Sequence, residues 1–283
     1  MIFANDSMLI FRSRNQSPPD NEIWYYAPEQ VTLYSEADVT SHTFSGGKGV
    51  ITYSSAVTTV PQTLREVTTV TDVKLPSIVT RIGNDAFNGC TSLALTSLPD
   101  GVTGLIGHWA FSGCSSLALT SLPDGVTSIG QGAFSGCSSL TLTSLPDGVT
   151  YMGGFAFRGC KKIALTYLPE GLTSIAFQTF NGCTSLALTS LPEGVTSIGG
   201  AAFLNCSSLA LTVLPKGLTT IEGNAFTSCT GLTSITFMGT PTKLNATAFN
   251  GCTNLKDIYV PWAEGDIAGA PWGATNATVH YTG

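Results

Sequence analysis

Eight cysteines recur along the chain at an almost constant spacing, and they are the first residues to consider for chemistry. The first step is 24 residues and every later step is 23, and the positions are Cys90, Cys114, Cys137, Cys160, Cys183, Cys206, Cys229 and Cys252. Structural zinc sites use pairs of ligands only about two to four residues apart. The cysteine spacing therefore argues against a zinc site.

Disulfide formation is the other chemistry that regularly spaced cysteines suggest. If the repeats stack, equivalent Cα atoms lie about 5 Å apart, which is within the range for a disulfide. Parallel side chains, however, leave the Cβ atoms about 5 Å apart instead of the roughly 3.8 Å that a bridge needs. We therefore expect free, buried thiols that act as small hydrophobic side chains.

A phenylalanine stands three residues before each cysteine, and it indicates which element positions the thiols. These residues are Phe87, Phe111, Phe134, Phe157, Phe180, Phe203, Phe226 and Phe249. A repeat this strict predicts a solenoid, because one unit cannot bury its apolar face without its neighbours. A clean copy, residues 133–150, reads AFSGCSSLTLTSLPDGVT.

Each copy predicts the same local path. Ala-Phe-x-x-Cys suits one helical or 3₁₀ turn with Phe and Cys on one face. A short strand should then end at a leucine, because the next residue is a proline, which cannot donate to a ladder. Pro-Asp/Glu-Gly turns the chain, and residues 126–130 return with Val126 and Ile129 pointing inward. We expect one parallel strand per coil, with neighbouring strands about 4.8 Å apart.

The repeat pattern L-x-x-x-x-L-P-x-x-[VL]-x-x-I-x-x-x-A-F-x-x-C-x-x-L resembles the BspA-like leucine-rich repeats over residues 70–261. The resemblance implies a leucine-rich-repeat solenoid. It also implies a function in recognition, because this family occurs on bacterial and protist surface proteins and in some phage-encoded proteins.

The middle copies depart from the family pattern. They place threonine where the family has an apolar residue, as at Thr96 and Thr143, and they put a leucine one position earlier. Strict strand alternation would turn these leucines outward as an exposed apolar stripe, which is typical of a binding site. A bulge or a later strand start would turn them into the core instead, and we favour this second orientation. The column comprises Leu95, Leu119, Leu142, Leu165, Leu188 and Leu211.

The two ends of the chain do not repeat, and solenoids need caps. We predict a β-rich N-terminal cap or module over residues 1–62, the solenoid over 63–261 and a short C-terminal cap over 262–283. Strands are expected in the first region at 23–26, 31–34 and 49–53. In the last region we expect a strand at 279–281 that continues the sheet. There Trp262 and Trp272 are either a ligand platform or lids on the core, and we favour lids.

Composition excludes several partners. The net charge is −6 and the pI about 4.9, so no basic stripe exists for nucleic acid or for an anionic membrane surface. No apolar run reaches about 18 residues, so we expect no membrane insertion. Residues 1–12 lack the basic and apolar regions of a signal peptide.

Catalytic patterns are weak. Asp100, Asp124, Asp147, Glu170 and Glu193 form a column at the turns, which is either a solvated edge or a weak site for divalent cations. We favour the solvated edge. His42, His108 and His280 lie in three separate regions, so a catalytic triad is not supported. We predict no catalytic residue, cofactor or metal.

The remaining candidates for a binding site are the positions at which bulky or charged residues replace the small residues of the repeat. Aromatic and arginine side chains are typical of binding hot spots, although drift on a tolerant surface explains such replacements equally well. The candidate binding residues are Trp109, Tyr151, Arg158, Lys161, Lys162 and Tyr167, with Leu119, Leu142, Leu165 and Leu188 of the leucine column.

These observations favour a non-catalytic, monomeric binding scaffold that recognises a protein or a glycan at a cell surface, outside the cell or on a virion. One alternative is a carbohydrate-active enzyme on a solenoid, which needs acids and bases on one face. The other is a rigid spacer whose residues 1–62 do the binding.

Overall fold

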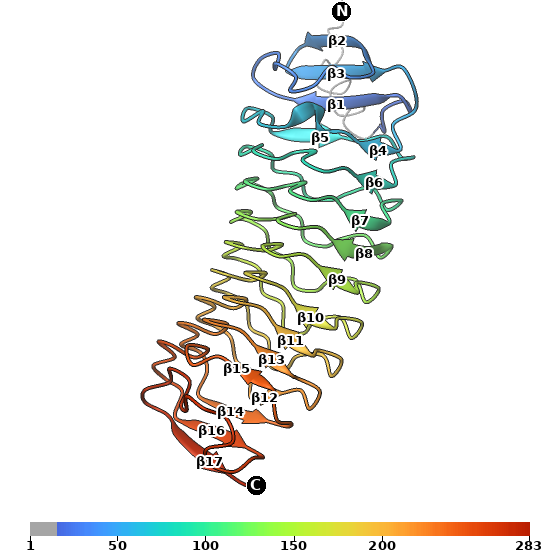
Figure 1. Cartoon of the computed structure of the whole chain (residues 1–283). Helices are drawn as coiled ribbons and strands as arrows, with labels where there is room; N and C mark the ends of the chain where they lie inside the picture. The colour runs from blue at the N-terminus through green and yellow to red at the C-terminus, as the bar shows by residue number, and fades with distance from the viewer. Residues whose placement is uncertain (1–15) are drawn as a thin grey trace, which may run out of the picture.

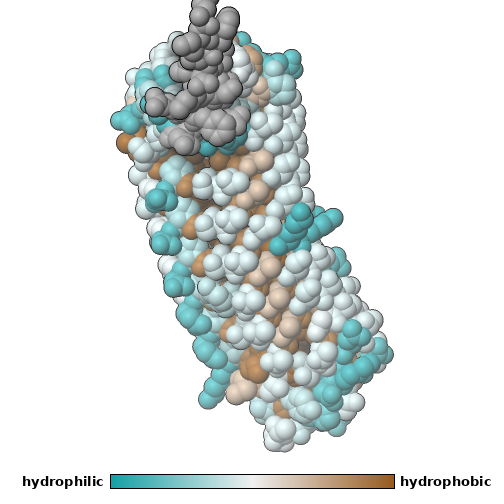
Figure 2. All heavy atoms as spheres, turned by 180° about the vertical axis from the view of Figure 1, so that it is seen from behind, coloured by the Kyte–Doolittle hydropathy of each residue, from teal (hydrophilic) through white to brown (hydrophobic). Residues whose placement is uncertain are grey.

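The computed structural model describes residues 16–283. They form an elongated stack of coils (Figure 1), and Figure 2 shows the surface of this stack from behind. A small sheet caps the N-terminal end, and a second sheet lies at the C-terminal end (Figure 1). The N-terminal stretch considered for a signal peptide lies outside the described residues.

Each coil contributes one short parallel strand, and along one side of the solenoid the strands form a ladder that divides into two sheets, one of five strands and one of four (Figure 1). Equivalent residues pair in register, as Ile129 does with Met152. The extra residue of the second coil is absorbed as a register shift at Gly104, whose φ is +69°. The strands are β4 (Thr59–Val60), β6 (Arg81–Ile82), β7 (Gly104–Ile106), β8 (Val126–Ile129), β9 (Tyr151–Met152), β10 (Ser174–Ile175), β11 (Ser197–Ile198), β13 (Thr220–Ile221) and β15 (Lys243–Leu244).

This ladder lies after the Pro-Asp/Glu-Gly turn, so the strand predicted before the proline is wrong for the middle coils. There the chain is extended but irregular. Strands form on that side only towards the two ends of the solenoid, as β5 (Asp72–Lys74), β12 (Val213–Leu214), β14 (Ser234–Phe237), β16 (Asp257–Val260) and β17 (Thr278–Tyr281).

The spacing of the buried residues explains the difference. Buried Ile235 and Phe237 of β14 are two residues apart, which fits the alternation of a strand. Buried Leu142 and Leu145 of a middle coil are three apart, so no alternating strand can bury both. The chain instead takes an irregular path in which both leucines point inward. We refer to this side of the solenoid as the irregular face.

The leucine column therefore belongs to the core, as we favoured. Leu119, Leu142, Leu165 and Leu188 are completely buried, whereas threonines of the intervening column such as Thr143 are exposed. The alternative of an exposed leucine stripe is wrong, and these four leucines are not available to a partner.

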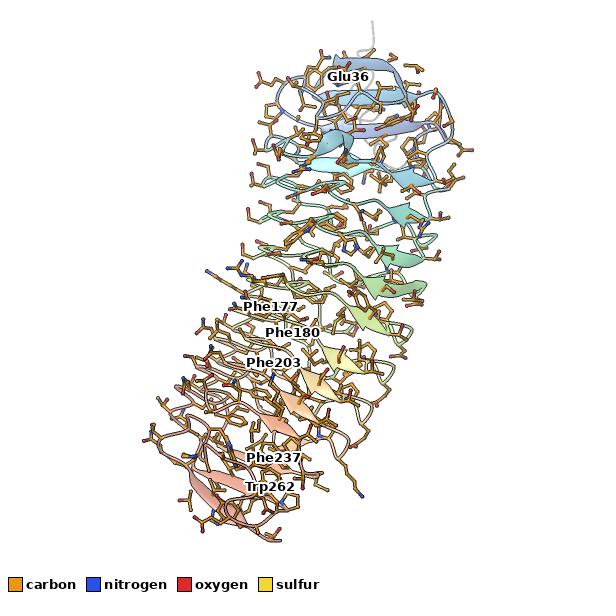
Figure 3. The ribbon with its side chains drawn as sticks, viewed as in Figure 1. Glu36, Phe177, Phe180, Phe203, Phe237 and Trp262 are labelled. Atoms are coloured by element: carbon orange, nitrogen blue, oxygen red, sulfur yellow. The ribbon has the colours of Figure 1, made fainter. Side chains whose placement is uncertain are left out.

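Phenylalanine and cysteine form two continuous columns through the core. The rings of successive coils stack with centroids 5.1 to 5.7 Å apart, as for Phe180 and Phe203 in Figure 3. All eight thiols are free and buried. The segment between them is a tight turn, in which the backbone N–H of Cys137 donates to the carbonyl of Phe134.

The N-terminal cap is an antiparallel sheet in the order β2 (Val39–Ser45), β3 (Lys48–Tyr53), β1 (Glu22–Tyr26) and β5. Pairing of β1 with β5 connects this cap to the first coil. The 3₁₀ turn η1 (Gln62–Leu64) follows β4. The strand predicted at 31–34 is wrong: this segment packs Val31 and Leu33 inward but has no strand partner.

At the opposite end, β17 pairs in parallel with β16, as predicted. The tryptophans are lids and not a platform, because Trp262 is 3 % exposed and Trp272 is fully buried. Trp262 packs edge-on against Phe237, 5.2 Å between centroids (Figure 3).

Candidate functional site

The tight turn of most coils begins with a residue in the left-handed backbone region, two residues before the phenylalanine. Only glycine takes this conformation without strain, so the other residues there carry a cost. Because equivalent residues stack, their side chains form a row along the solenoid. The row comprises Asp85, Trp109, Gly132, Phe155, Gln178, Ala201 and Asn224, with φ between +54° and +62°.

Two large rings of this row meet although they lie two coils apart. The ring centroids of Trp109 and Phe155 are 6.2 Å apart. Gly132 lies between them in the row, and a Cβ atom there would overlap the Trp109 ring. The absent side chain of Gly132 thus provides the space in which Trp109 reaches towards Phe155.

A third ring joins from the next coil. Phe177 packs edge-on against Phe155, with centroids 5.2 Å apart and planes at 79°. It replaces a glycine of the repeat and remains 49 % exposed, beside Gly154 and Gly200. We call Trp109, Phe155 and Phe177 the aromatic cluster. Three rings held against one another by packing form a pre-shaped apolar surface that solvent reaches.

One cationic side chain adjoins this cluster, and two more follow it on the same coil. The guanidinium carbon of Arg158 lies 5.9 Å from the centroid of Phe155, which is cation–π distance. Lys161 and Lys162 follow on the same coil and are exposed. Within residues 16–283, none of these three cations forms an ion pair.

The structure brings together some of the predicted residues and separates others. Trp109 and Arg158 belong to one site. Tyr151 on β9 and Tyr167 on the irregular face are about half exposed but make no ring contact in the described part of the chain.

Sequence reasoning missed Phe155 and Phe177. Both break the repeat in the same way as Trp109, because neighbouring coils have Gly132 and Gly200 at their positions. A comparison of every repeat position, glycines included, would have found them.

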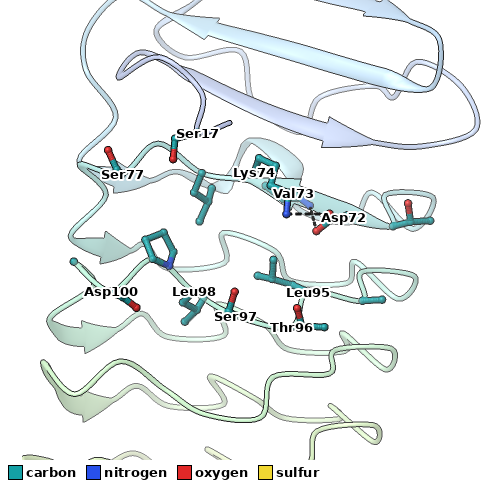
Figure 4. Close-up of a pocket in the computed structure, with 15 residues that line it drawn as sticks. Ser17, Asp72, Val73, Lys74, Ser77, Leu95, Thr96, Ser97, Leu98 and Asp100 are labelled. Carbon is teal, nitrogen blue, oxygen red and sulfur yellow. Dashed lines mark hydrogen bonds and ion pairs between the residues drawn. The ribbon is translucent and has the colours of Figure 1, made fainter. Parts of the chain in front are cut away.

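A groove of about 600 Å³ lies where the N-terminal cap meets the first irregular coil (Figure 4). On one side of the groove is the regular strand β5, and on the other is an irregular segment of the next coil. Backbone hydrogen bonds join the two coils at Ala94–Thr71 and at Thr103–Thr80, and between these two points their backbones do not pair. Hydroxyl groups and Leu98 line the groove. Its charges are partly neutralised, because Lys74 pairs with Asp72 at 3.5 Å. The groove is therefore a weaker candidate than the aromatic cluster.

The thiols are unsuited to nucleophilic chemistry. Burial raises the pKa of Cys206 to about 12 and that of Cys252 to about 11, and it raises the pKa of the other six thiols as well. The reactive species is the thiolate, so these thiols are inert at neutral pH.

Residues 16–283 show neither a metal site nor a membrane-spanning helix. No group of three or more His, Cys, Asp or Glu side chains there is placed to hold a metal ion. No helix in that range is long and apolar enough to cross a bilayer.

Comparison with protein families identifies the repeat. The model described as "BspA type Leucine rich repeat region", with six copies, matches residues 58–187 and 155–267. These two ranges together span 58–267, which is most of the chain. No curated protein matches the chain.

One solved structure with a TM-score above 0.5 shares the fold, and two further leucine-rich-repeat structures are similar to the chain. A leucine-rich repeat protein from Bacteroides ovatus is 22 % identical with a TM-score of 0.57, over 94 % of this chain and 77 % of its own. A leucine-rich repeat protein of T. pallidum is 35 % identical with a TM-score of 0.47, over 55 % and 73 %. A leucine-rich cell surface protein of Faecalibacterium prausnitzii is 22 % identical with a TM-score of 0.43, over 91 % and 96 %.

Proposed function

The chain belongs to the BspA-type leucine-rich-repeat family, and on this premise we propose that it is a non-catalytic binding scaffold that recognises a protein or a glycan through the aromatic cluster. The observation that carries the proposal is the position of the cluster: its three rings stand where the repeat needs no large side chain. Stacking of the coils does not require these rings. Trp109 and Phe155 are partly exposed and Phe177 is exposed, and accessible aromatic side chains beside arginine are typical of binding hot spots.

We place this recognition at a cell surface, outside a cell or on a virion, with the chain acting as a monomer. The family resemblance supports the surface location. Surface labelling of the source cells or particles tests it, and light scattering of the purified chain tests the monomer.

The binding test compares the full chain with two variants. Phe155→Gly and Phe177→Gly give each position the residue of a neighbouring coil, so both should fold. Pull-down from surface extracts and a glycan array should show ligands whose capture falls at least about tenfold in both variants, as for loss of a hot spot worth about 1.4 kcal/mol or more. A matched control is Tyr167→Ser, which removes an exposed ring from the irregular face and should leave capture unchanged.

The same material separates the alternatives. Release of sugars from a polysaccharide panel would favour a carbohydrate-active enzyme. Binding that both cluster variants retain, but that substitutions in the N-terminal cap abolish, would favour a spacer.

A further inference from the structure

Positive charge is concentrated on one coil of an otherwise acidic chain. Three of the six Lys and Arg residues between positions 76 and 250 fall within five residues: the six are Arg81, Arg158, Lys161, Lys162, Lys216 and Lys243. The preceding coil has serines at the three equivalent positions, so stacking does not require the charges. They have no ion-pair partner among the described residues and remain available to an outside anion.

Arg158 joins these charges to the aromatic cluster. Its guanidinium group lies over the Phe155 ring. This contact leaves the N–H donors of the guanidinium free, because no carboxylate of residues 16–283 binds them. A guanidinium held in this way can donate paired hydrogen bonds to a carboxylate or a sulfate. A ligand that contacts the Phe155 ring therefore also meets an anion-binding group.

The backbone beside the cluster offers no strand edge to a peptide. The N–H groups of Trp109, Gly132, Phe155 and Gln178 already donate to carbonyls of the following coil, at 2.8 to 3.0 Å. Extended peptides commonly gain affinity by pairing with free backbone groups at a sheet edge. At this site, recognition must come from ring surfaces and cations, and this set suits a sugar chain better than an extended peptide.

We infer that the aromatic cluster, with Arg158, Lys161 and Lys162, binds an anionic polysaccharide that carries carboxylate or sulfate groups. The inference rests on the proposed function and names its ligand class. Because Trp109, Phe155 and Phe177 come from coils stacked along the axis, the sugar chain lies along the solenoid, with its acidic groups on the side of the cations.

Four immobilised polymers test this inference with the full chain: polygalacturonate (carboxylated), dextran sulfate (sulfated), dextran (neutral) and poly-glutamate (an acidic peptide). We expect binding to one or both anionic polysaccharides, weakened by salt because screening reduces the charge interaction. We expect clearly weaker binding to dextran and to poly-glutamate.

Matched variants locate the site. Arg158→Ser with Lys161→Ser and Lys162→Ser uses the residues of the preceding coil and lowers the net charge from −6 to −9. Lys216→Asp with Lys256→Ser lowers it by the same three charges elsewhere. We expect at least a tenfold loss for the first variant and less than a threefold loss for the second, with unchanged thermal midpoints. Phe177→Gly should also weaken binding.

Three results would overturn the inference. Equal losses in both charge variants would show that only overall charge matters. Binding to poly-glutamate as strong as to the polysaccharides would show that sugar is not recognised. Binding to dextran alone, or to none of the four polymers, would exclude an anionic polysaccharide, while capture of another ligand that depends on Phe155 and Phe177 would leave the proposed function standing.

Discussion

The Sγ atom of Cys137 donates a hydrogen bond to the backbone carbonyl of Phe111, one coil earlier, at 3.0 Å. The same carbonyl accepts the backbone N–H of Cys114 in its own coil at 3.1 Å. Every cysteine of the repeat makes the corresponding bond, at 2.9 to 3.1 Å. The cysteine is therefore a hydrophobic side chain that also carries one donor, and it connects each coil to the preceding one.

Removal of one thiol should destabilise the stack locally. Cys137→Ala loses the inter-coil hydrogen bond and leaves a small cavity, and we expect a loss of about 1–3 kcal/mol in the free energy of unfolding. Urea unfolding followed by circular dichroism measures this. The control Ser139→Ala changes a nearby, partly exposed residue whose hydroxyl makes no hydrogen bond to the described residues, and it should stay within about 0.5 kcal/mol. Equal stability of the two variants would show that the thiol bond contributes nothing.

The architecture could be predicted from the sequence because the core residues repeat so strictly. The Phe and Cys columns, the inward Val126 and Ile129, and the strand at 279–281 all follow from apolar periodicity and appear in the structure. The prediction of which side of the coil carries the ladder was wrong, because the strands lie after the proline turn and not before it. A leucine spacing of three before the proline contradicts a strand, but a single repeat read by itself resembles one.

The aromatic cluster was predictable only in part. Trp109 and Arg158 stand out because they replace smaller residues of the repeat, whereas the contact of Trp109 with Phe155 spans two coils. That contact depends on the space above Gly132 and on left-handed backbone angles, which a residue pattern does not reveal. Tyr151 and Tyr167 are also larger than the residues at their positions in most other coils, but they make no ring contact with the cluster.

Buried thiols should resist modification until the chain unfolds. With a pKa of about 11 for Cys252 and higher for most others, less than about one thiol in a hundred is ionised at pH 8. A disulfide reagent should therefore find close to none of the eight thiols in the native protein and all eight in guanidinium chloride. Rapid reaction of several thiols without denaturant would contradict the burial.

The same shifts predict alkaline unfolding. Burial raises the pKa of Cys206 from 9.0 to about 12, so the folded state holds its proton while the unfolded state releases it. The stabilisation is complete below about pH 9 and is lost as the pH rises towards 12, by up to about 1.4 kcal/mol per pH unit for each thiol. Melting temperatures measured from pH 7 to 11 should fall steeply above pH 9. The melting temperature of Cys206→Ala should be lower at pH 7 but should fall less steeply above pH 9. Parallel curves for the two proteins would contradict the linkage.

The orientation of the leucine column can be tested on one coil. Leu142→Ala removes a fully buried side chain and should cost about 2–5 kcal/mol, whereas Thr143→Ala on the exposed neighbour should cost less than about 0.5 kcal/mol. Urea unfolding gives both values, and hydrogen exchange should show faster opening of the coils adjacent to Leu142→Ala. A larger effect of Thr143→Ala would reverse the orientation.

The backbone conformation before the cysteine favours glycine, and the repeat contains its own control. Gly136 has φ +78°, while Asn205 at the equivalent position has φ +61°. A Cβ at Gly136 would make only ordinary contacts, at 3.5 Å or more, so steric overlap is not the reason for glycine there. Gly136→Ala should therefore cost about 1–2 kcal/mol through the left-handed conformation alone, and Asn205→Gly should gain up to about 1 kcal/mol. Opposite shifts of the thermal midpoint would confirm this, and shifts of the same sign would show that contacts, and not backbone conformation, select the residue at this turn.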